Sequence, residues 1–228
     1  MTVILVLATF LVFIVLDYVI NRHEAIVAVP AKACPVEAAG TIPARKGGEI
    51  IDGFLVPQDL SYHPGHSWLV RERKSVMRIG ADEFAAALLG KLEKIELPKP
   101  GQWLRQGQRA LSFFRAGEKT EMVSPTEGEV LEVNAEVLNN PDVLRRDPYG
   151  KGWLLTIHVP DEENTRRNLV PKSLIRDWMR DAVERLYARQ PALAGAVAAE
   201  GGRPTEDLLA DLPEANWSQV TAEFFLLG

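Results

Sequence analysis

Residues 147–155 read Asp-Pro-Tyr-Gly-Lys-Gly-Trp-Leu-Leu, and this stretch says more about the fold than any other part of the chain. Turn-forming residues fill its first half, and an apolar run begins in its second half, which predicts a strand over residues 153–159. Upstream, residues 124–128 read Ser-Pro-Thr-Glu-Gly and precede a second predicted strand, residues 129–133. Short strands between Pro, Gly and Asn clusters are typical of a small β barrel or sandwich.

Glycines and one helical segment add local detail to this prediction. Residues 81–89 read as a short helix, and Gly90 is expected to end it as the residue after the helix. Gly101 and Gly128 lie in predicted turns, where we expect a positive φ that glycine adopts without steric cost.

Five groups of residues, taken in order, resemble the glycine cleavage system H protein family. They are residues 62–68 (Tyr-His-Pro-Gly-His-Ser-Trp), 80–92, 97–107, 124–134 and 140–150. The resemblance implies a barrel-sandwich hybrid, mainly β with flanking helices. It also implies a carrier without catalytic activity, whose lipoyl group is attached to one lysine at the tip of a hairpin. Trp68 and Trp153 have strand positions and apolar neighbours, so we expect them in or beside the core.

Glycine occupies the position at which the resemblance implies the lipoyl-lysine. Counting seven residues back from Ser124 and ten forward from Gly107 both reach Gly117. The Glu-Ser-x triplet of the family is replaced by Phe-Arg-Ala at residues 114–116. Lys119, two residues past the expected apex, is interpreted as an exposed turn lysine. The sequence therefore predicts that no lipoyl group or other cofactor is bound.

Two functions remain open at this point. The first is a non-catalytic, non-lipoylated H-protein-like accessory or scaffold subunit of a membrane-associated complex. The second is a membrane-tethered lipoyl carrier related to the H protein and modified on Lys119. The loss of the tip lysine favours the first, although kinship of fold is a weak basis for assigning function. The sequence does not name the partner complex or the oligomeric state.

A membrane anchor is predicted at residues 1–22, because residues 3–16 are uncharged and apolar and the run continues through residue 20. Arg22, Lys32, Arg45 and Lys46 follow the run and no Lys or Arg precedes it. The positive-inside rule then predicts a single-pass protein of the inner membrane with its folded domain in the cytoplasm. Cleavage near Cys34, as in a lipoprotein, is a weaker alternative because this cysteine lies far beyond the apolar run.

The remaining chain divides into three further segments. Residues 23–57 are predicted to be a linker, residues 58–161 the barrel, and residues 162–228 a helical C-terminal extension. Within the extension, apolar residues recur at helical spacing over residues 174–187, and a second helix is expected at residues 205–212. The apolar end, residues 217–227, is expected to fold onto the core or to enter a partner.

Evidence for other chemistry is weak. His63 and His66 have a spacing that metal ligands can use, but no third ligand is evident, so no metal site is predicted. Ser67 and Ser124 have no motif-level base, so no enzymatic activity is predicted. The net charge of −5 gives no indication of a nucleic-acid surface, and the single cysteine excludes an internal disulfide.

Overall fold

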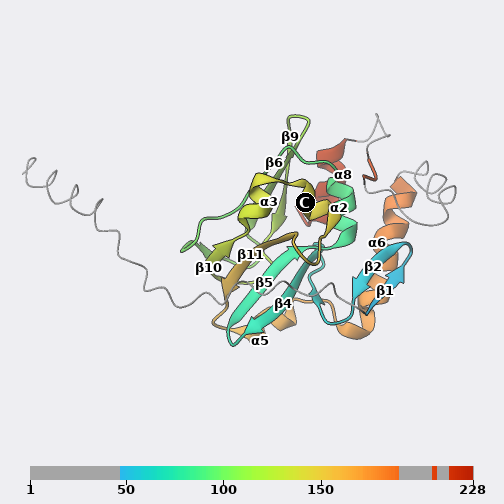
Figure 1. Cartoon of the computed structure of the whole chain (residues 1–228). Coiled ribbons are helices and arrows are strands. Elements are labelled where there is room, and N and C mark those ends of the chain that lie inside the picture. Colours follow the sequence, from blue (N-terminus) through green and yellow to red (C-terminus); the bar gives the residue numbers. More distant parts are fainter. Residues whose placement is uncertain (1–46, 190–206, 210–215, 228) are drawn as a thin grey trace, which may run out of the picture. The chain divides into compact units, whose positions relative to one another are not determined.

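The computed structural model describes residues 47–189, 207–209 and 216–227 (Figure 1). These residues belong to one compact unit that spans Thr41–Gly228. The predicted anchor at residues 1–22, most of the predicted linker, and most of the helix expected at residues 205–212 lie outside the described residues. Within the described ranges, no helix is both long enough and apolar enough to cross a bilayer.

Three antiparallel sheets form the β part of the molecule. The largest has six strands in the order β3 (Ser61–Tyr62), β4 (Ser67–Arg73), β5 (Val76–Ala81), β11 (Trp153–His158), β10 (Gly128–Val133) and β7 (Trp103–Leu104). The second has the order β6 (Lys94–Glu96), β8 (Arg109–Arg115) and β9 (Glu118–Val123). The third is a hairpin of β1 (Gly48–Ile51) and β2 (Phe54–Pro57). The mainly β fold with flanking helices is therefore confirmed.

Seven helical segments lie beside these sheets within the described residues. They are α2 (Glu83–Leu89), α3 (Ala135–Asn139), α4 (Asp142–Arg146), α5 (Glu162–Arg167), η1 (Lys172–Leu174), α6 (Ile175–Arg189) and α8 (Trp217–Phe224). The predicted helix at residues 81–89 is α2, with the Asp82 side chain accepting a hydrogen bond from the Ala85 N–H at its start. Gly90 ends it with a φ of 65°, as expected.

The Asp-Pro-Tyr-Gly segment joins distant parts of the chain through hydrogen bonds. The Trp68 indole donates to the Pro148 carbonyl at 3.1 Å, and the Tyr149 hydroxyl donates to the Leu55 carbonyl at 2.7 Å. The Asp147 carboxylate accepts from the N–H groups of Gly150 and Lys151. This turn therefore positions β11 in the largest sheet and also holds β2, which explains why its sequence is so informative.

The two tryptophans predicted for the core differ in burial. Trp68 is fully buried, whereas Trp153 is half-buried and packs against the edge of the core. The Arg78 guanidinium lies 4.8 Å from the Trp153 ring, so this tryptophan combines apolar contact with a cation–π interaction. The prediction is confirmed for both residues, but Trp153 contributes less burial than Trp68.

Residues 48–57 fall in the predicted linker and form the β1–β2 hairpin instead. Asp52 and Gly53 make its two-residue loop with φ values of 45° and 92°, as a type I′ turn requires. Phe54 and Val56 are buried, and the Phe54 ring meets the Phe84 ring of α2 edge-on at 5.3 Å. The linker prediction is therefore wrong for this stretch, because Asp-Gly between apolar residues is itself a strong hairpin signal.

One glycine prediction is correct and one is wrong. Gly101 has a φ of 83° and occupies a turn. Gly128 does not have a positive φ; it begins β10 in close approach to β11. A Cβ atom built at Gly128 would lie 2.1 Å from the His158 carbonyl oxygen. Glycine is thus required there by interstrand packing rather than by a turn conformation.

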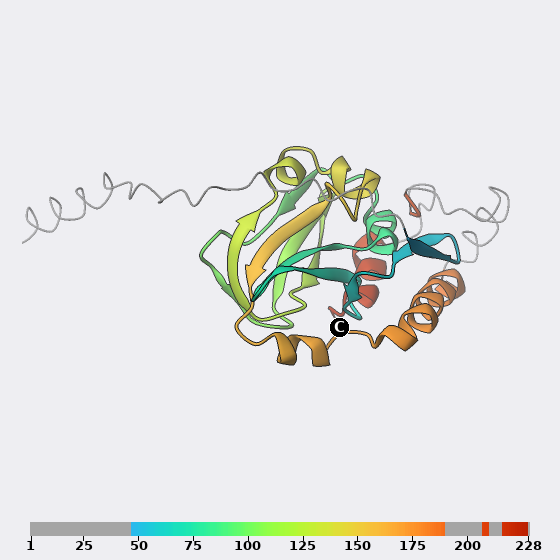
Figure 2. The same ribbon diagram turned by 60° about the horizontal axis from the view of Figure 1, so that its bottom comes forward.

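The C-terminal extension packs on the folded domain. The apolar stripe predicted at residues 174–187 forms the buried face of α6, whereas Leu174, in η1, is exposed. Figures 1 and 2 both show α6 beside the β1–β2 hairpin, and Trp178 stacks on His66 with ring centroids 4.7 Å apart. In α8, Trp217 and Phe224 are buried, as is Phe225 just after it. The apolar end of the chain therefore folds back onto the core.

Candidate functional site: the β8–β9 hairpin

The hairpin of β8 and β9 has its apex at the predicted position. Arg115 pairs with Glu118, which leaves Ala116 and Gly117 as a two-residue loop with φ values of 49° and 80°. Both values are positive, so the loop is a type I′ turn, for which glycine is well suited. A Cβ atom at Gly117 would have no heavy atom within 4 Å, so the apex faces open space. Figure 1 shows the tip of β9 projecting beyond the sheets.

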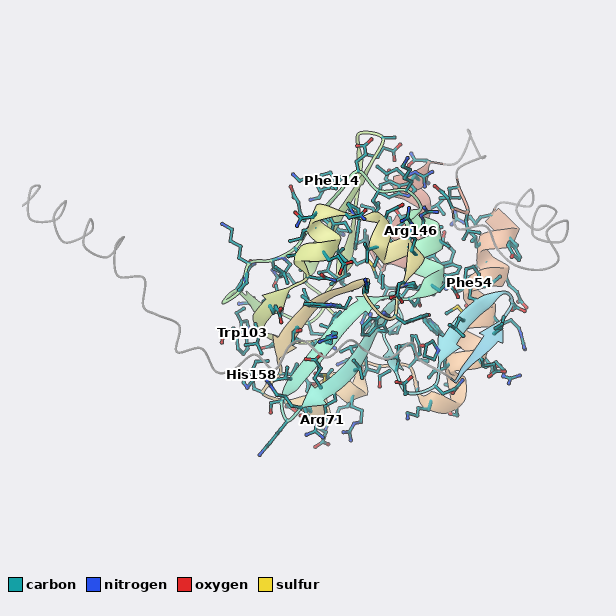
Figure 3. All side chains as sticks on the ribbon, in the orientation of Figure 1. Phe54, Arg71, Trp103, Phe114, Arg146 and His158 are labelled. Carbon is teal, nitrogen blue, oxygen red and sulfur yellow. The ribbon has the colours of Figure 1, made fainter. Side chains whose placement is uncertain are left out.

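Lys119 lies on β9 opposite Phe114 of β8, as the register shows, and its amine points away from the tip. Its Nζ is 2.7 Å from Glu121 Oε1, two residues farther from the apex on the same face of the strand. The Lys119 Nζ is also 6.0 Å from the Phe114 ring, which Figure 3 labels near the hairpin. The Lys119 side chain is 48% exposed. It is thus a solvated strand lysine with an acidic neighbour.

The charge of Glu121 is stabilised by this arrangement. The hydrogen bond from Lys119 is the main cause that lowers the pKa of the Glu121 carboxyl below its usual value, and Ser112 adds a smaller contribution. The pair lies at the surface, where such ion pairs contribute about 0–1 kcal/mol. The interaction therefore orients the Lys119 amine without contributing much to stability.

Side chains of the C-terminal segment hold the same hairpin. The Glu118 carboxylate accepts a hydrogen bond from the Ser218 N–H at 3.0 Å, where α8 begins. The buried Thr221 hydroxyl donates to the Thr120 hydroxyl at 2.7 Å. In this way the first half of β9 is joined to α8 both at the surface and in the interior.

Two arginines of β8 also bond to other parts of the chain. The Arg115 guanidinium donates to Asp207 Oδ1 at 2.9 Å and to the Leu89 carbonyl at 3.2 Å. Arg109 donates to the carbonyl of Leu227 at 2.6 Å. Sequence reasoning missed this bracing of the hairpin. The spacing of Trp217, Thr221 and Phe224 signals one buried helical face, but it does not identify the strand that this face contacts.

The two histidines considered as metal ligands are both buried. His66 is fully buried, with its Nδ1 2.9 Å from Asp82 Oδ2 and its ring between Phe84 and Trp178. His63 accepts a hydrogen bond at Nδ1 from the Gly65 N–H. Burial, with a smaller effect from His66, lowers the His63 pKa from 6.5 to about 4. In the described parts of the chain, no three His, Cys, Asp or Glu side chains are placed to hold a metal ion.

The two serines considered as nucleophiles have no base within reach among the described residues. The Ser67 hydroxyl is buried and makes no hydrogen bond. The Ser124 hydroxyl donates to the Thr126 carbonyl at 2.7 Å. Neither serine therefore has the hydrogen-bonded base and the open approach that nucleophilic catalysis requires.

Comparison with known proteins connects this hairpin to a family. The model of the family described as "Glycine cleavage H-protein" matches residues 60–182. The chain is 34% identical over 106 residues to a glycine cleavage system H protein of Mycobacterium leprae, covering 46% of this chain and 80% of the relative. It is 37% identical over 104 residues to the H protein of Laribacter hongkongensis, covering 46% of this chain and 82% of that protein. A crystal structure of a glycine cleavage system H protein from Mycobacterium marinum is also similar, with 26% identity, a TM-score of 0.43, and coverage of 46% of this chain and 87% of that one.

The family match contains the β8–β9 hairpin and ends within α6, so α8 lies outside it. On the extent of the match and the identity to its relatives, this chain belongs to the glycine cleavage H-protein family.

Proposed function

We propose that this protein is a non-lipoylated member of its family that serves as an accessory or scaffold subunit of a membrane-associated complex. The observation that carries the proposal is the apex of the β8–β9 hairpin. Gly117 stands at the apex, and glycine has no side chain that could carry an acyl group. A domain with the carrier fold and no attachment point at its hairpin apex would act by binding other proteins.

The position of Lys119 supports this proposal. A residue two positions along a strand is displaced by about 6–7 Å, which is large compared with the tolerance of a positioned active site. The Lys119 amine is further held by Glu121, on the side away from the apex. A ligase that recognises a lysine at the apex would therefore find this amine displaced and already paired.

The bracing of the hairpin also supports a scaffold. A lipoyl carrier must present its modified residue to successive partners. In this chain Glu118 and Thr120, next to the apex, bond to α8, and Arg115 bonds to Asp207. Residues that flank the apex are thus committed to contacts within the chain, which favours a fixed platform.

The membrane part of the proposal depends on the apolar segment at residues 3–20 and the basic residues that follow it. Sodium carbonate treatment of membranes should leave the protein in the pellet, and protease added to spheroplasts should leave the folded domain intact. Release by carbonate, or digestion from outside, would refute this part alone. If the protein stays in the membrane pellet, its copurification in mild detergent would identify the partner subunits.

The decisive experiment on the carrier function is intact-mass analysis of the protein purified from its own host. We expect the mass of the polypeptide without a lipoyl or octanoyl adduct. As a control, a Gly117→Lys variant should be incubated with a lipoate–protein ligase beside the wild type. The apex has open space for the new side chain, and the positive φ there puts a limited local strain on the turn, so the variant should remain folded at a small cost in stability.

The alternative function is a membrane-tethered carrier modified on Lys119. The observation that favours it is that Lys119 lies close to the apex and is about half exposed. A lipoyl or octanoyl adduct that maps to Lys119, and that is lost in Lys119→Arg, would establish this alternative and refute the scaffold proposal. An unmodified chain that copurifies with membrane proteins would support the scaffold.

A further inference from the structure

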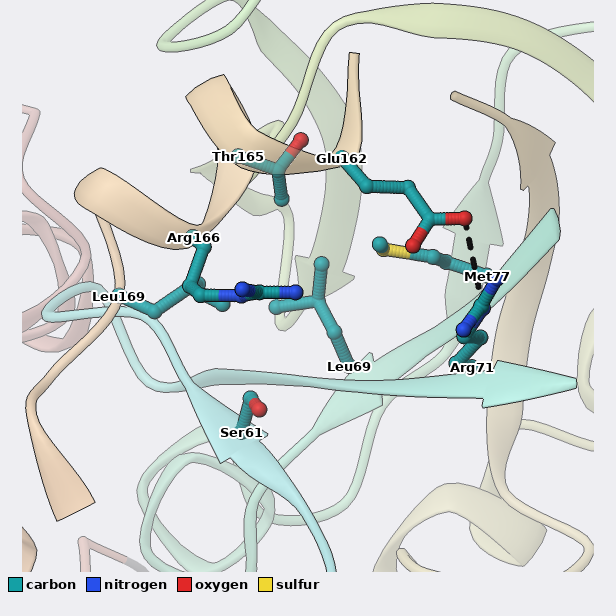
Figure 4. A pocket seen from close by; sticks show the side chains of 8 residues that line it. All are labelled: Ser61, Leu69, Arg71, Met77, Glu162, Thr165, Arg166 and Leu169. Carbon is teal, nitrogen blue, oxygen red and sulfur yellow. Dashed lines mark ion pairs between the residues drawn. The ribbon is translucent and has the colours of Figure 1, made fainter. Parts of the chain in front are cut away.

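A pocket of about 150 Å³ lies between β4, β5 and α5, away from the hairpin (Figure 4). Eight side chains line it: Ser61, Leu69, Arg71, Met77, Glu162, Thr165, Arg166 and Leu169. None of them is on β8 or β9, and Figure 3 shows Arg71 and Phe114 at opposite ends of the described domain. The pocket is therefore independent of the candidate carrier site.

The lining separates into an apolar part and a charged part. Leu69, Met77 and Leu169 supply the apolar part, and Ser61 and Thr165 add two hydroxyl groups. Figure 4 shows the Arg166 side chain extended across the pocket toward Leu69, with Arg71 and Glu162 on the other side. A ligand in this pocket would meet hydrocarbon from Leu69, Met77 and Leu169, with the Arg166 guanidinium at one end and the Arg71–Glu162 pair at the other.

The charges in the lining do not cancel. Arg71 and Arg166 contribute two positive charges and Glu162 one negative charge, which leaves a net charge of +1. The Glu162 Oε1 atom is already engaged by Arg71 Nε at 3.3 Å and by the Ser75 N–H at 2.7 Å. The Arg166 guanidinium, in contrast, has no hydrogen bond or ion pair with any residue that the structure describes. The unmatched charge is therefore located on Arg166.

The next residue on the same helix shows that Arg166 is distinctive. Arg167 donates to Glu163 Oε1 at 3.1 Å in an exposed pair one turn apart. Both arginines belong to α5, but only Arg166 lines the pocket. An uncommitted guanidinium over an apolar surface is the arrangement that binds a carboxylate with a short hydrocarbon tail.

From this geometry, we propose that the pocket between β4, β5 and α5 binds a short-chain monocarboxylate. Its carboxylate would bond to Arg166, and its tail would lie against the parts of Leu69, Met77 and Leu169 that line the pocket. The volume of about 150 Å³ equals roughly five water molecules, which fits a carboxylate of about four carbons. Ligands of this size bind with a dissociation constant on the order of 1 mM.

NMR signals of the methionine methyl groups provide a direct readout of binding in this pocket. The chain has four methionines, and the full-length protein with ¹³C-labelled methionine methyls would be titrated with butyrate. Met77 lines the pocket, whereas Met122 and Met179 are buried in the core away from it. We expect the Met77 signal, assigned with Met77→Leu, to shift in a saturable way while Met122 and Met179 stay fixed.

Two matched variants and two further anions complete the test. Arg166→Gln should weaken butyrate binding about tenfold or more, because it removes a charge-assisted hydrogen bond. Arg167→Gln should leave the affinity unchanged. Acetate and inorganic phosphate should bind more weakly than butyrate, because they cannot cover the apolar surface.

The inference is overturned by any of three results. The first is a Met77 signal that does not move with butyrate, and the second is equal weakening of binding by Arg166→Gln and Arg167→Gln. The third is phosphate that matches butyrate at Met77, which would show a simple anion site. Unchanged Met122 and Met179 signals in each variant establish that its fold is intact. All of these outcomes are separate from the state of Lys119, so they do not depend on the proposed function.

Discussion

The attachment of α8 to the carrier-like domain can be tested by Phe224→Ala. Phe224 is 1% exposed and its ring lies 5.2 Å from Phe84 and 6.2 Å from His66. Arg185 also lies over this ring, at 5.4 Å from its centroid. Removal of the ring takes away burial at the junction of α2, α6 and α8 and leaves a cavity among three helices.

The expected loss follows from the buried area. An aromatic side chain buries about 150–250 Å², which at about 25 cal/mol per Å² corresponds to roughly 4–6 kcal/mol. Measured Phe→Ala substitutions in cores cost about 3–5 kcal/mol. We therefore expect the free energy of unfolding to fall by about 4 kcal/mol. For a domain of this size that corresponds to a decrease in Tm of roughly 8–16 °C.

Urea denaturation followed by tryptophan fluorescence would measure this loss, with Leu226→Ala as the control. Leu226 is 50% exposed, so its truncation should change stability by less than about 0.5 kcal/mol. Hydrogen exchange should also show faster exchange of the Thr120 region in Phe224→Ala, because Thr221 then no longer holds Thr120. A loss below about 1 kcal/mol with unchanged exchange on β9 would refute the bracing of the hairpin by α8.

Three further predictions concern stability. His63 has a folded pKa of about 4 against 6.5 in the unfolded chain, so its contribution is complete above pH 6.5 and is lost as the pH falls toward 4. The loss of unfolding free energy should approach about 3 kcal/mol and should be absent in His63→Asn, as measured by urea titrations at several pH values. The same dependence of unfolding free energy on pH in both proteins would contradict the burial of neutral His63. Trp68→Ala should lower the free energy of unfolding by about 3–5 kcal/mol, because the side chain is fully buried and its indole donates to Pro148. Trp153 is half-buried, so Trp153→Ala should cost clearly less. Equal losses would show that burial does not determine the cost. Gly128→Ala should destabilise the protein by about 1–3 kcal/mol through a clash with the His158 carbonyl, and a neutral thermal shift would show that β10 and β11 separate easily.

Features that depend on local sequence were predictable. The end of α2 at Gly90 follows from the conformational freedom of glycine, and the apex at Gly117 follows from two independent counts along the chain. The β1–β2 hairpin was also accessible, because Asp52-Gly53 between apolar residues is a local turn signal. It was missed because small residues around it were interpreted as a linker.

Features that depend on tertiary contacts were not predictable in this way. The requirement for glycine at position 128 comes from the His158 carbonyl, which belongs to a different strand. Likewise, the hydrogen bond between Thr120 and Thr221 joins residues far apart in the chain. Periodicity identifies which face of a helix is buried, but the strand or helix that it contacts depends on the packing of the whole domain. The pocket beside α5 was missed for the same reason.

The hairpin apex shows that this fold does not depend on which side chain stands at position 117. A Cβ atom at position 117 would have no heavy atom within 4 Å, so a side chain there would not contact the core. The type I′ turn, in contrast, is favoured by glycine, because both loop residues have a positive φ. Replacement of a tip lysine by glycine would therefore remove the carrier chemistry while relieving strain in the turn. Contacts from Asp207 and α8 add stability to both strands of the hairpin, so the hydrogen bonds around this apex favour a rigid hairpin.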